Sequence, residues 1–420
     1  MKKYTFEKVD ESIYKETLDN GLEIYMYPTK KTKNFYITIS VKYGSRVLKY
    51  EVGNEENEVI PGSAHFLEHK VMAISENERF SSKLKELGSF ANAWTNSYGT
   101  NYNLFGSKDI YENIRILLDI FYNTNINDKN VDEEKGIIGE EIDMYKDRIN
   151  VHMHELMFKN LFSKSYVRNT TVGERKDIEK ITSNSLNKIY NDFYIPNNTF
   201  IIVCGDFDTK ECLNVIKKEI NKYKPIKKEI PSLITEKEPI EVNKKYEEII
   251  KDVESEKVRI GFKIKKDLLG INDDNILRYY LDIILSCYIS PTSKLFEKYK
   301  MNELFFGGGY NVSIVDDYLV LCVTAECKDA DKFIKQVLKD IKNIKITKED
   351  FERKKKIYLK AYITDFDSIE DIEYNICMSL FIDGYINYKE YSDIINLNYE
   401  DACKIISKLN FDNYCIIKCK

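Results

Sequence analysis

The segment PGSAHFLEH (61–69) contains two of the chain's four histidines, four positions apart, with a glutamate directly before the second. If the segment is helical, His65 and His69 lie on one face, about 40° apart around the axis, and Glu68 lies on the neighbouring edge. Two imidazoles in this arrangement can bind one Zn²⁺, and an adjacent carboxylate can accept a proton from water. The pattern H-x-x-E-H therefore predicts a hydrolytic zinc site. By itself it also fits two exposed helical histidines beside a carboxylate.

A tetrahedral zinc site of this kind needs a third protein ligand, because its fourth position is left for water. The segment VDEEKGIIGEEIDMYKD (131–147) contains the candidates. On a helical wheel, Glu134 and Glu141 fall within one apolar stripe, whereas Glu140 falls well outside it. The apolar members of the stripe are Ile137, Ile138, Ile142, Met144 and Tyr145. Carboxylates in a core-facing stripe are costly unless they are paired or bind a metal, so the wheel favours Glu141 or Glu134 as the ligand. A stripe that faces a polar cleft, or acids that meet lysines, are the alternatives.

The apolar patterns indicate which elements must position these side chains. The run TFIIVCGD (199–206) is expected to be a strand that ends in a turn, and the polar, proline-containing stretch 224–245 is expected to be a linker. The second half repeats the style of the first, with an alternating strand at 257–264 and a buried helix at 276–289. We therefore expect an α+β fold with two domains of similar topology, each a mainly antiparallel β-sheet with helices packed on one face. The expected divisions are a zinc-binding domain at 1–223, the linker at 224–245 and a second domain at 246–420.

Composition and charge exclude several classes of function. Hydrophobic residues make up 43% and charged residues 32% of the 420 positions, which is typical of a globular protein. The net charge of −5, with both signs mixed, predicts no nucleic-acid partner. The N-terminus lacks the apolar segment of a secretory signal, and no apolar run is long enough for a membrane span. None of the nine cysteines forms a CxxC pair, so we expect buried reduced thiols and a cytoplasmic location.

Taken in order, these motifs resemble the insulinase/pitrilysin family of inverzincin peptidases. They are most similar to the smaller subfamily that includes the mitochondrial processing peptidase. PGSAHFLEH matches the family's G-x-x-H-F-L-E-H, and GIIGEEI places the family's third ligand on Glu141. The resemblance implies one Zn²⁺ per chain, bound by His65, His69 and Glu141. It also implies that Glu68 is the catalytic base, and that Glu134, seven residues before Glu141, assists catalysis by orienting a ligand or tuning Glu68.

A second motif concerns the substrate. GSFANAWTNSYGTNY (88–102) resembles the family's G-x-x-N-A-x-T-x-x-x-T-x-Y, an edge strand beside the zinc that binds the substrate peptide by β-addition. The resemblance implies that Asn92 and Ala93 contact substrate, although Asn92 also fits an ordinary turn or strand-edge residue. The implied activity is that of a zinc-dependent endopeptidase acting on extended peptides. Leader removal or maturation in a peptide or protein modification pathway is the candidate role.

The resemblance weakens at 290–310, where the family has an Arg–Tyr pair that binds substrate and stabilises the oxyanion. Lys300 and Phe306 stand near those positions, and neither can supply the same groups. The resemblance therefore implies a catalytically degenerate second domain and a heterodimer, in which a zinc-less homologous subunit supplies the pair and each chain forms a clam-like half-chamber. Gly307–Gly309 fit either a substrate-adjacent loop or a turn before a strand. A non-catalytic structural subunit of a larger complex is the alternative function.

Overall fold

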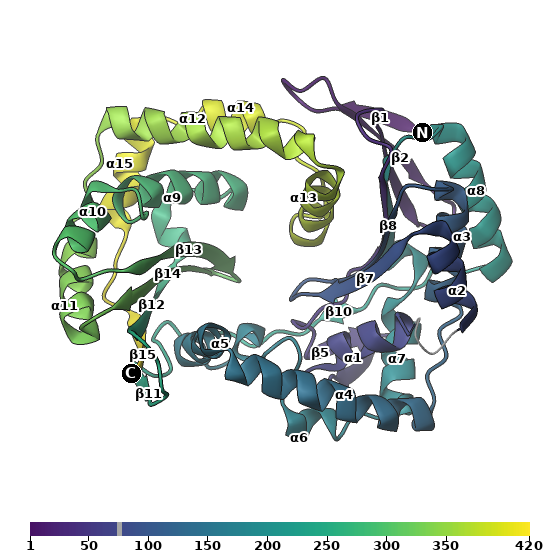
Figure 1. The fold of residues 1–420 in the computed structure, drawn as a ribbon, viewed down its shortest axis with the longest axis horizontal. Coiled ribbons are helices and arrows are strands. Elements are labelled where there is room, and N and C mark those ends of the chain that lie inside the picture. Colours follow the sequence, from purple (N-terminus) through teal and green to yellow (C-terminus); the bar gives the residue numbers. More distant parts are fainter. Residues whose placement is uncertain (74–77) are drawn as a thin grey trace. The chain divides into compact units, whose positions relative to one another are not determined.

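A computed structural model describes residues 1–73 and 78–420 (Figure 1). The chain forms two compact units, and each unit is built from more than one segment of the sequence. Unit 1 contains Met1–Met144, Asn169–Thr235 and Ile363–Lys389; unit 2 contains Tyr145–Arg168, Glu236–Tyr362 and Glu390–Lys420. The division into 1–223, 224–245 and 246–420 stays a prediction. The units differ from it mainly because residues 145–168 belong to unit 2 and residues 363–389 belong to unit 1.

Unit 1 is built on a seven-stranded sheet whose order is β1-β2-β3-β9-β4-β8-β7. The strands are β1 (Lys2–Thr5), β2 (Ser12–Thr17), β3 (Glu23–Pro28), β4 (Phe35–Val41), β7 (Phe90–Thr95), β8 (Thr100–Gly106) and β9 (Thr199–Gly205). Only β3 and β9 pair in parallel; the other neighbours are antiparallel, as expected. The expected strand at 199–206 is β9, which is buried along its whole length. A smaller sheet, of order β10-β5-β6, consists of β5 (Lys49–Val52), β6 (Glu55–Glu58) and β10 (Ser232–Leu233).

One face of the large sheet carries the main core of unit 1. Phe66 from the helix of the H-x-x-E-H motif, Leu117 and Ile216 pack there with Ile37 and Tyr102 of the sheet. The helices of unit 1 that contribute to this core or lie beside it are α1 (Ser63–Val71), α2 (Glu78–Leu87), α3 (Ile110–Tyr122), α4 (Asp128–Asp147), α7 (Ser183–Phe193) and α8 (Thr209–Tyr223). Side chains before the helices fix several of their starts, as Asp208 does by accepting hydrogen bonds from the first backbone N–H groups of α8.

Unit 2 contains a five-stranded sheet of order β11-β15-β12-β14-β13. Its strands are β11 (Tyr246–Ile249), β12 (Glu256–Lys265), β13 (Gly307–Val315), β14 (Tyr318–Cys327) and β15 (Tyr414–Cys419). Its core is formed with α9 (Asp274–Tyr288), α10 (Lys294–Met301), α11 (Ala330–Asp340), α12 (Lys348–Thr364) and α15 (Tyr399–Lys408). Gly307–Gly309 belong to β13 itself rather than to a loop or turn. Gly308 has a φ of 128°, and a Cβ there would lie 2.2 Å from the carbonyl oxygen of Thr324 on β14, so the close strand approach requires glycine.

The second face of each sheet is covered by one helix from the other half of the sequence. In unit 2, α5 (Ile149–Leu161) packs Met157 and Leu161 against the sheet. In unit 1, α13 (Ile369–Ile382) packs Cys377 and Phe381 against β9. The α+β class, the two-domain organisation and the mainly antiparallel sheets are confirmed. The prediction that helices pack on one face of each sheet is incomplete, because α5 and α13 each cover the second face of a sheet.

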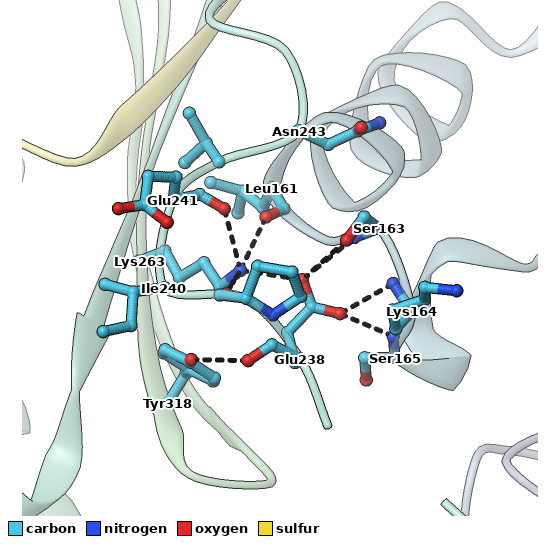
Figure 2. A network of polar contacts seen from close by, with 12 residues as sticks. Leu161, Ser163, Lys164, Ser165, Glu238, Ile240, Glu241, Asn243, Lys263 and Tyr318 are labelled. Atoms are coloured by element: carbon cyan, nitrogen blue, oxygen red, sulfur yellow. Dashed lines mark hydrogen bonds and ion pairs between the residues drawn. The ribbon is translucent and has the colours of Figure 1, made fainter. Parts of the chain in front are cut away.

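The stretch expected to be a linker is anchored in unit 2 by a buried ion pair (Figure 2). Lys263 on β12 has a fully buried side chain, and its Nζ lies 2.9 Å from Glu238 Oε1 and 2.7 Å from the carbonyl oxygen of Pro239. The Glu238 carboxylate also accepts backbone hydrogen bonds from Lys164 and Ser165, at 2.7 and 2.8 Å. The charges of Lys263 and Glu238 are buried away from water, so each depends on the other and on its hydrogen bonds. These contacts therefore hold residues 236–241 against the sheet and the end of α5.

Two further features bear on the predicted class of protein. All nine cysteines are free, and seven of them are buried. Within residues 1–73 and 78–420, no helix is both long enough and apolar enough to cross a bilayer.

Candidate metal centre

Helix α1 carries the H-x-x-E-H motif, and its start depends on Gly62. This residue has a φ of 92°, and a Cβ there would lie 2.8 Å from the carbonyl oxygen of Val172, so the left-handed conformation and the close contact both favour glycine. Directly after it, Phe66 and Leu67 are buried in the core of unit 1 and fix the rotation of the helix. With that rotation fixed, His65 is buried and His69 is half-buried.

The two histidines converge on Glu141 of α4. His65 Nε2 and His69 Nε2 lie 3.6 and 3.4 Å from Glu141 Oε2, and the two imidazole rings lie 4.6 Å apart, edge to face. One potential ligand atom from each of the three residues lies within 4.8 Å of the others. Ligand atoms at about 2.0–2.1 Å from a tetrahedral zinc lie about 3.3 Å from each other. The observed separations therefore fit a His₂Glu zinc site, and of the wheel's two candidates Glu141 is the one whose carboxylate faces Nε2 of both histidines.

Glu134 lies behind the histidines rather than beside Glu141. Its Oε1 lies 2.9 Å from His69 Nδ1, so that Nδ1–H can donate to the carboxylate and leave the Nε2 lone pair directed at the cluster. Its Oε2 accepts a 2.8 Å hydrogen bond from Lys70 Nζ, which also donates to the carbonyl oxygen of Asn130 at 3.1 Å. The Glu134 side chain is 9% exposed and that of Lys70 is fully buried. Glu134 thus fixes the orientation of the His69 imidazole, and Lys70 fixes the position of the Glu134 carboxylate.

The charges of the cluster follow from these contacts. Burial, together with the neighbouring His69, lowers the pKa of His65 to about 4, so its imidazole is neutral near pH 7. Burial opposes protonation of His69, but hydrogen bonds to Glu134 and Glu141 outweigh it and raise its pKa to about 9. Burial opposes ionisation of Glu134, yet the hydrogen bonds from His69 and Lys70 lower its pKa to about 2. Glu134 therefore carries negative charge beside His69, which favours a divalent cation next to the histidines.

Glu68 lies next to the cluster and is held by a residue of β7. Its Oε2 accepts a 2.6 Å hydrogen bond from Thr95 Oγ1. Burial raises the pKa of Glu68, whereas the bond from Thr95 and the nearby His69 lower it. A carboxylate with a raised pKa and a fixed direction is suited to accept a proton and release it again.

A pocket with a volume of about 670 Å³ opens beside the cluster. Glu68, His69 and Glu134 line one side of it, and β7 lines another, including both Asn92 and Ala93. β7 is the last strand of the seven-stranded sheet in the part of the chain that the structure describes. The Ala93 side chain packs into the core on the side of α1, whereas strand alternation directs Asn92 to the opposite face. The pocket adjoins Glu68 and an edge strand, so it can hold an extended chain next to the candidate base.

The structure corrects the predicted stripe of α4. Ile137 and Met144 are exposed, by 58% and 45%, although both were expected to face the core. The buried face runs through Val131, Glu134, Ile138 and Ile142. Glu141 lies at the edge of this face, with a side chain that is 24% exposed, which lets it reach the histidines without entering the core.

Sequence reasoning missed two residues of the site, Lys70 and Thr95. Lys70 directly follows His69 and occupies the position four residues after Phe66, so it continues the core-facing side of α1. That position was the available signal. Thr95 ends the ANAWT segment and occupies the threonine position of the motif N-A-x-T, which was the available signal. Lys300 and Phe306 belong to unit 2, where Lys300 Nζ lies 5.8 Å from the ring of Phe305 and Phe306 is 55% exposed.

Comparisons with known proteins show which proteins this chain resembles. Residues 26–175 match the family described as insulinase (peptidase family M16), and residues 180–358 match the peptidase M16 inactive domain. The uncharacterized zinc protease YmfH of Bacillus subtilis is 29% identical over 73% of this chain and 72% of its own length. The zinc protease PqqE of Helicobacter pylori is 24% identical over 85% of this chain and 80% of its own. The crystal structure of an M16-like peptidase from Alicyclobacillus acidocaldarius has the same fold, with a TM-score of 0.87 at 22% identity over 97% of both chains.

Proposed function

Because the chain belongs to the insulinase family of peptidases, peptidase family M16, we propose that it is a zinc-dependent endopeptidase that cleaves extended peptides. One observation carries the proposal. Two imidazole nitrogens and a carboxylate oxygen lie within 4.8 Å of one another, and Glu68 lies beside them in the wall of a pocket. In this proposal His65, His69 and Glu141 bind one Zn²⁺ per chain.

The residues of this chain have distinct roles in the proposed reaction. Zinc bound by such a site supplies a Lewis acid that polarises a carbonyl and makes water more acidic. Glu68 accepts the proton of the attacking water and passes it to the leaving amine, and Thr95 keeps its carboxylate in place. Glu134 holds His69 through Nδ1, and so keeps Nε2 directed at the metal position.

The proposed substrate is a peptide in extended conformation that pairs with β7. The outer edge of this strand can donate and accept backbone hydrogen bonds along Asn92 and Ala93, and both residues line the pocket beside Glu68. Binding through the backbone tolerates many side chains, which suits removal of a leader or maturation of a peptide or protein. Folded proteins lack a free extended segment and are excluded as substrates.

The proposed partner is a homologous subunit without zinc. Lysine has no planar fork and phenylalanine has no hydroxyl, so Lys300 and Phe306 cannot provide an Arg–Tyr pair. A heterodimer in which a second chain provides these groups would complete the site. The nine free cysteines support a reducing compartment, and we propose the cytoplasm.

The test is the substitution Glu68→Gln in the full-length chain, assayed with unfolded peptides in the presence and absence of a coexpressed partner. We expect the loss of peptide cleavage, while zinc measured by atomic absorption stays near one ion per chain. Cleavage that survives the substitution would exclude Glu68 as the base. Carefully purified protein that holds no zinc in either preparation would exclude the metal site and favour a structural subunit.

A further inference from the structure

The side chains of β7 differ between the two faces of the sheet. Ala91 and Ala93 pack against the core on the side of α1. Phe90, Asn92 and Trp94 alternate with them and point to the face that α13 covers. One face of the strand is therefore built from small residues, and the other carries two large aromatic rings.

Helix α13 is held against this second face by buried contacts. Glu373 Oε1 accepts a 3.2 Å hydrogen bond from Asn101 Nδ2, and Asn101 lies directly opposite Trp94 in the register of β7 and β8. The Phe381 ring meets the Trp94 ring edge to face, with centroids 5.9 Å apart. The Tyr374 ring, one residue beyond Glu373, lies 6.0 Å from the Trp94 ring. Trp94 and Tyr374 therefore form an aromatic pair at a position fixed by the fold.

These three aromatic rings are partly or largely exposed to water, which is unfavourable for apolar side chains. Phe90 is 72% exposed, Tyr374 is 51% exposed and Trp94 is half-buried. Phe90 and Trp94 are four residues apart on one strand, so they are separated by about 13 Å along it. The Phe90 ring is not part of the core of unit 1. It lies beside the pocket that Glu68 lines.

We propose that Phe90, Trp94 and Tyr374 form a specificity surface that selects substrate peptides with large apolar or aromatic side chains four residues apart. The inference rests on the proposed function, in which the peptide pairs with β7. In a strand paired with β7, the residues opposite Phe90 and Trp94 are also four apart and point to the same face. One of these side chains contacts the Phe90 ring, and the other contacts the Trp94–Tyr374 pair.

The chain's single tryptophan makes the binding step measurable by itself. The probes are two peptides of about ten residues, built from Ser and Thr with two Phe, which differ only in whether the Phe residues are four or three apart. Spacing by three directs the second ring to the opposite face of the strand. With full-length Glu68→Gln protein and zinc, we expect Trp94 emission to change on binding. We also expect the four-spaced peptide to have a Kd about fivefold lower than that of the three-spaced peptide.

Two substitutions that remove exposed rings test whether these residues form the specificity surface. Phe90→Ser and Tyr374→Ser should each reduce the preference for the four-spaced peptide to about twofold or less, because each removes one of the two contacts. The matched control is Tyr385→Ser, which removes another exposed tyrosine of the segment 363–389 and should leave the fivefold preference unchanged. Equal affinity for the two peptides, no binding of either, or a preference that survives both substitutions would overturn the inference.

The unsubstituted chain separates this inference from the proposed function. If it cleaves both peptides while Glu68→Gln protein binds them equally, the specificity surface is wrong and the peptidase assignment stands. If Glu68→Gln protein prefers the four-spaced peptide while the unsubstituted zinc protein cleaves neither, with or without a coexpressed partner, the surface stands and the proposed hydrolysis is wrong.

Discussion

The Lys70 side chain is fully buried, and its Nζ lies 2.8 Å from Glu134 Oε2. The other oxygen of the same carboxylate bonds His69 Nδ1, so the ammonium, the carboxylate and the imidazole form one chain that ends at the metal position. A buried carboxylate with one cationic partner removed is destabilised, and it can then turn or take up a proton. Through Glu134, Lys70 is therefore a positioning residue for His69, a proposed metal ligand.

Replacing Lys70 by Met should lower the affinity for zinc. Methionine has a similar length and no charge, so the packing of α1 is largely kept while Glu134 loses its lysine partner and keeps only His69. We expect the zinc Kd to rise by about 10–100-fold, as is typical when a residue that orients a ligand is lost. The Kd is measured by competition with a chromophoric chelator, with circular dichroism to confirm folding. Lys129→Met, which removes an exposed lysine from α4, is the control and should change the Kd little. A folded Lys70→Met protein with unchanged zinc affinity would contradict the assignment.

Thr95 should affect turnover without affecting the metal. Its hydroxyl donates to Glu68 and to no proposed zinc ligand, so Thr95→Val leaves the base free to turn away from the pocket. A hydrogen bond to a charged group contributes about 1.5–3 kcal/mol, which corresponds to a loss of kcat of about tenfold or more. Zinc content should stay the same. Thr95→Ser keeps the donor and should restore most of the activity; a serine variant as slow as the valine variant would indicate a packing defect instead.

Much of the candidate site could be predicted because it depends on local periodicity. The spacing of His65 and His69 sets their common face in any helix. The wheel of 131–147 left Glu134 and Glu141 as candidates, and the family resemblance chose Glu141. Lys70 had only its core-facing position as a signal, which is weak because lysine on a helix is usually solvated and only the tertiary structure shows what covers it. Ile137 and Met144 were assigned to the core for the converse reason: they are apolar, but their side chains are exposed in the folded chain.

The fold class followed from alternating strands and amphipathic helices, whereas the exchange of α5 and α13 did not. Each helix is apolar enough to pack on a sheet, and nothing in its own sequence selects which sheet. That choice is made by contacts far apart in the chain, such as Cys377 against the sheet of unit 1. The ordered stretch around Glu238 was missed for a similar reason, since its partner Lys263 lies on a strand that a local pattern cannot connect to it.

The buried pair of Lys263 and Glu238 predicts a large loss of stability when one partner is removed. Lys263→Met leaves the Glu238 carboxylate buried with its backbone donors but without a cation, which should lower the free energy of unfolding by about 3–5 kcal/mol. The double substitution Lys263→Met with Glu238→Gln removes both charges and should cost less than Lys263→Met alone. Urea unfolding followed by circular dichroism measures both. Equal losses in the single and double variants would show that packing, rather than the unpaired charge, is responsible.

Glu373 on α13 predicts a dependence of stability on pH. Burial raises its pKa from 4.5 to about 7, although the hydrogen bond from Asn101 opposes this shift. Because the folded state keeps the proton to higher pH than the unfolded chain, the contribution of Glu373 is most favourable below about pH 4.5 and is lost as the pH rises to about 7. A shift of this size corresponds to roughly 3 kcal/mol between the two limits.

The substitution Glu373→Gln tests this directly, because glutamine keeps the neutral side chain at every pH. We expect the variant to match the unsubstituted protein near pH 5 and to be more stable near pH 8, by up to about 3 kcal/mol. Unfolding in urea is followed through Trp94, whose ring contacts Phe381 of the same helix and so reports on unit 1. Glu86→Gln, at an exposed position of α2 in the same unit, is the control and should keep the pH dependence of the unsubstituted protein. If both variants show the same pH dependence, then Glu373 is ionised in the folded state without cost and does not make stability depend on pH.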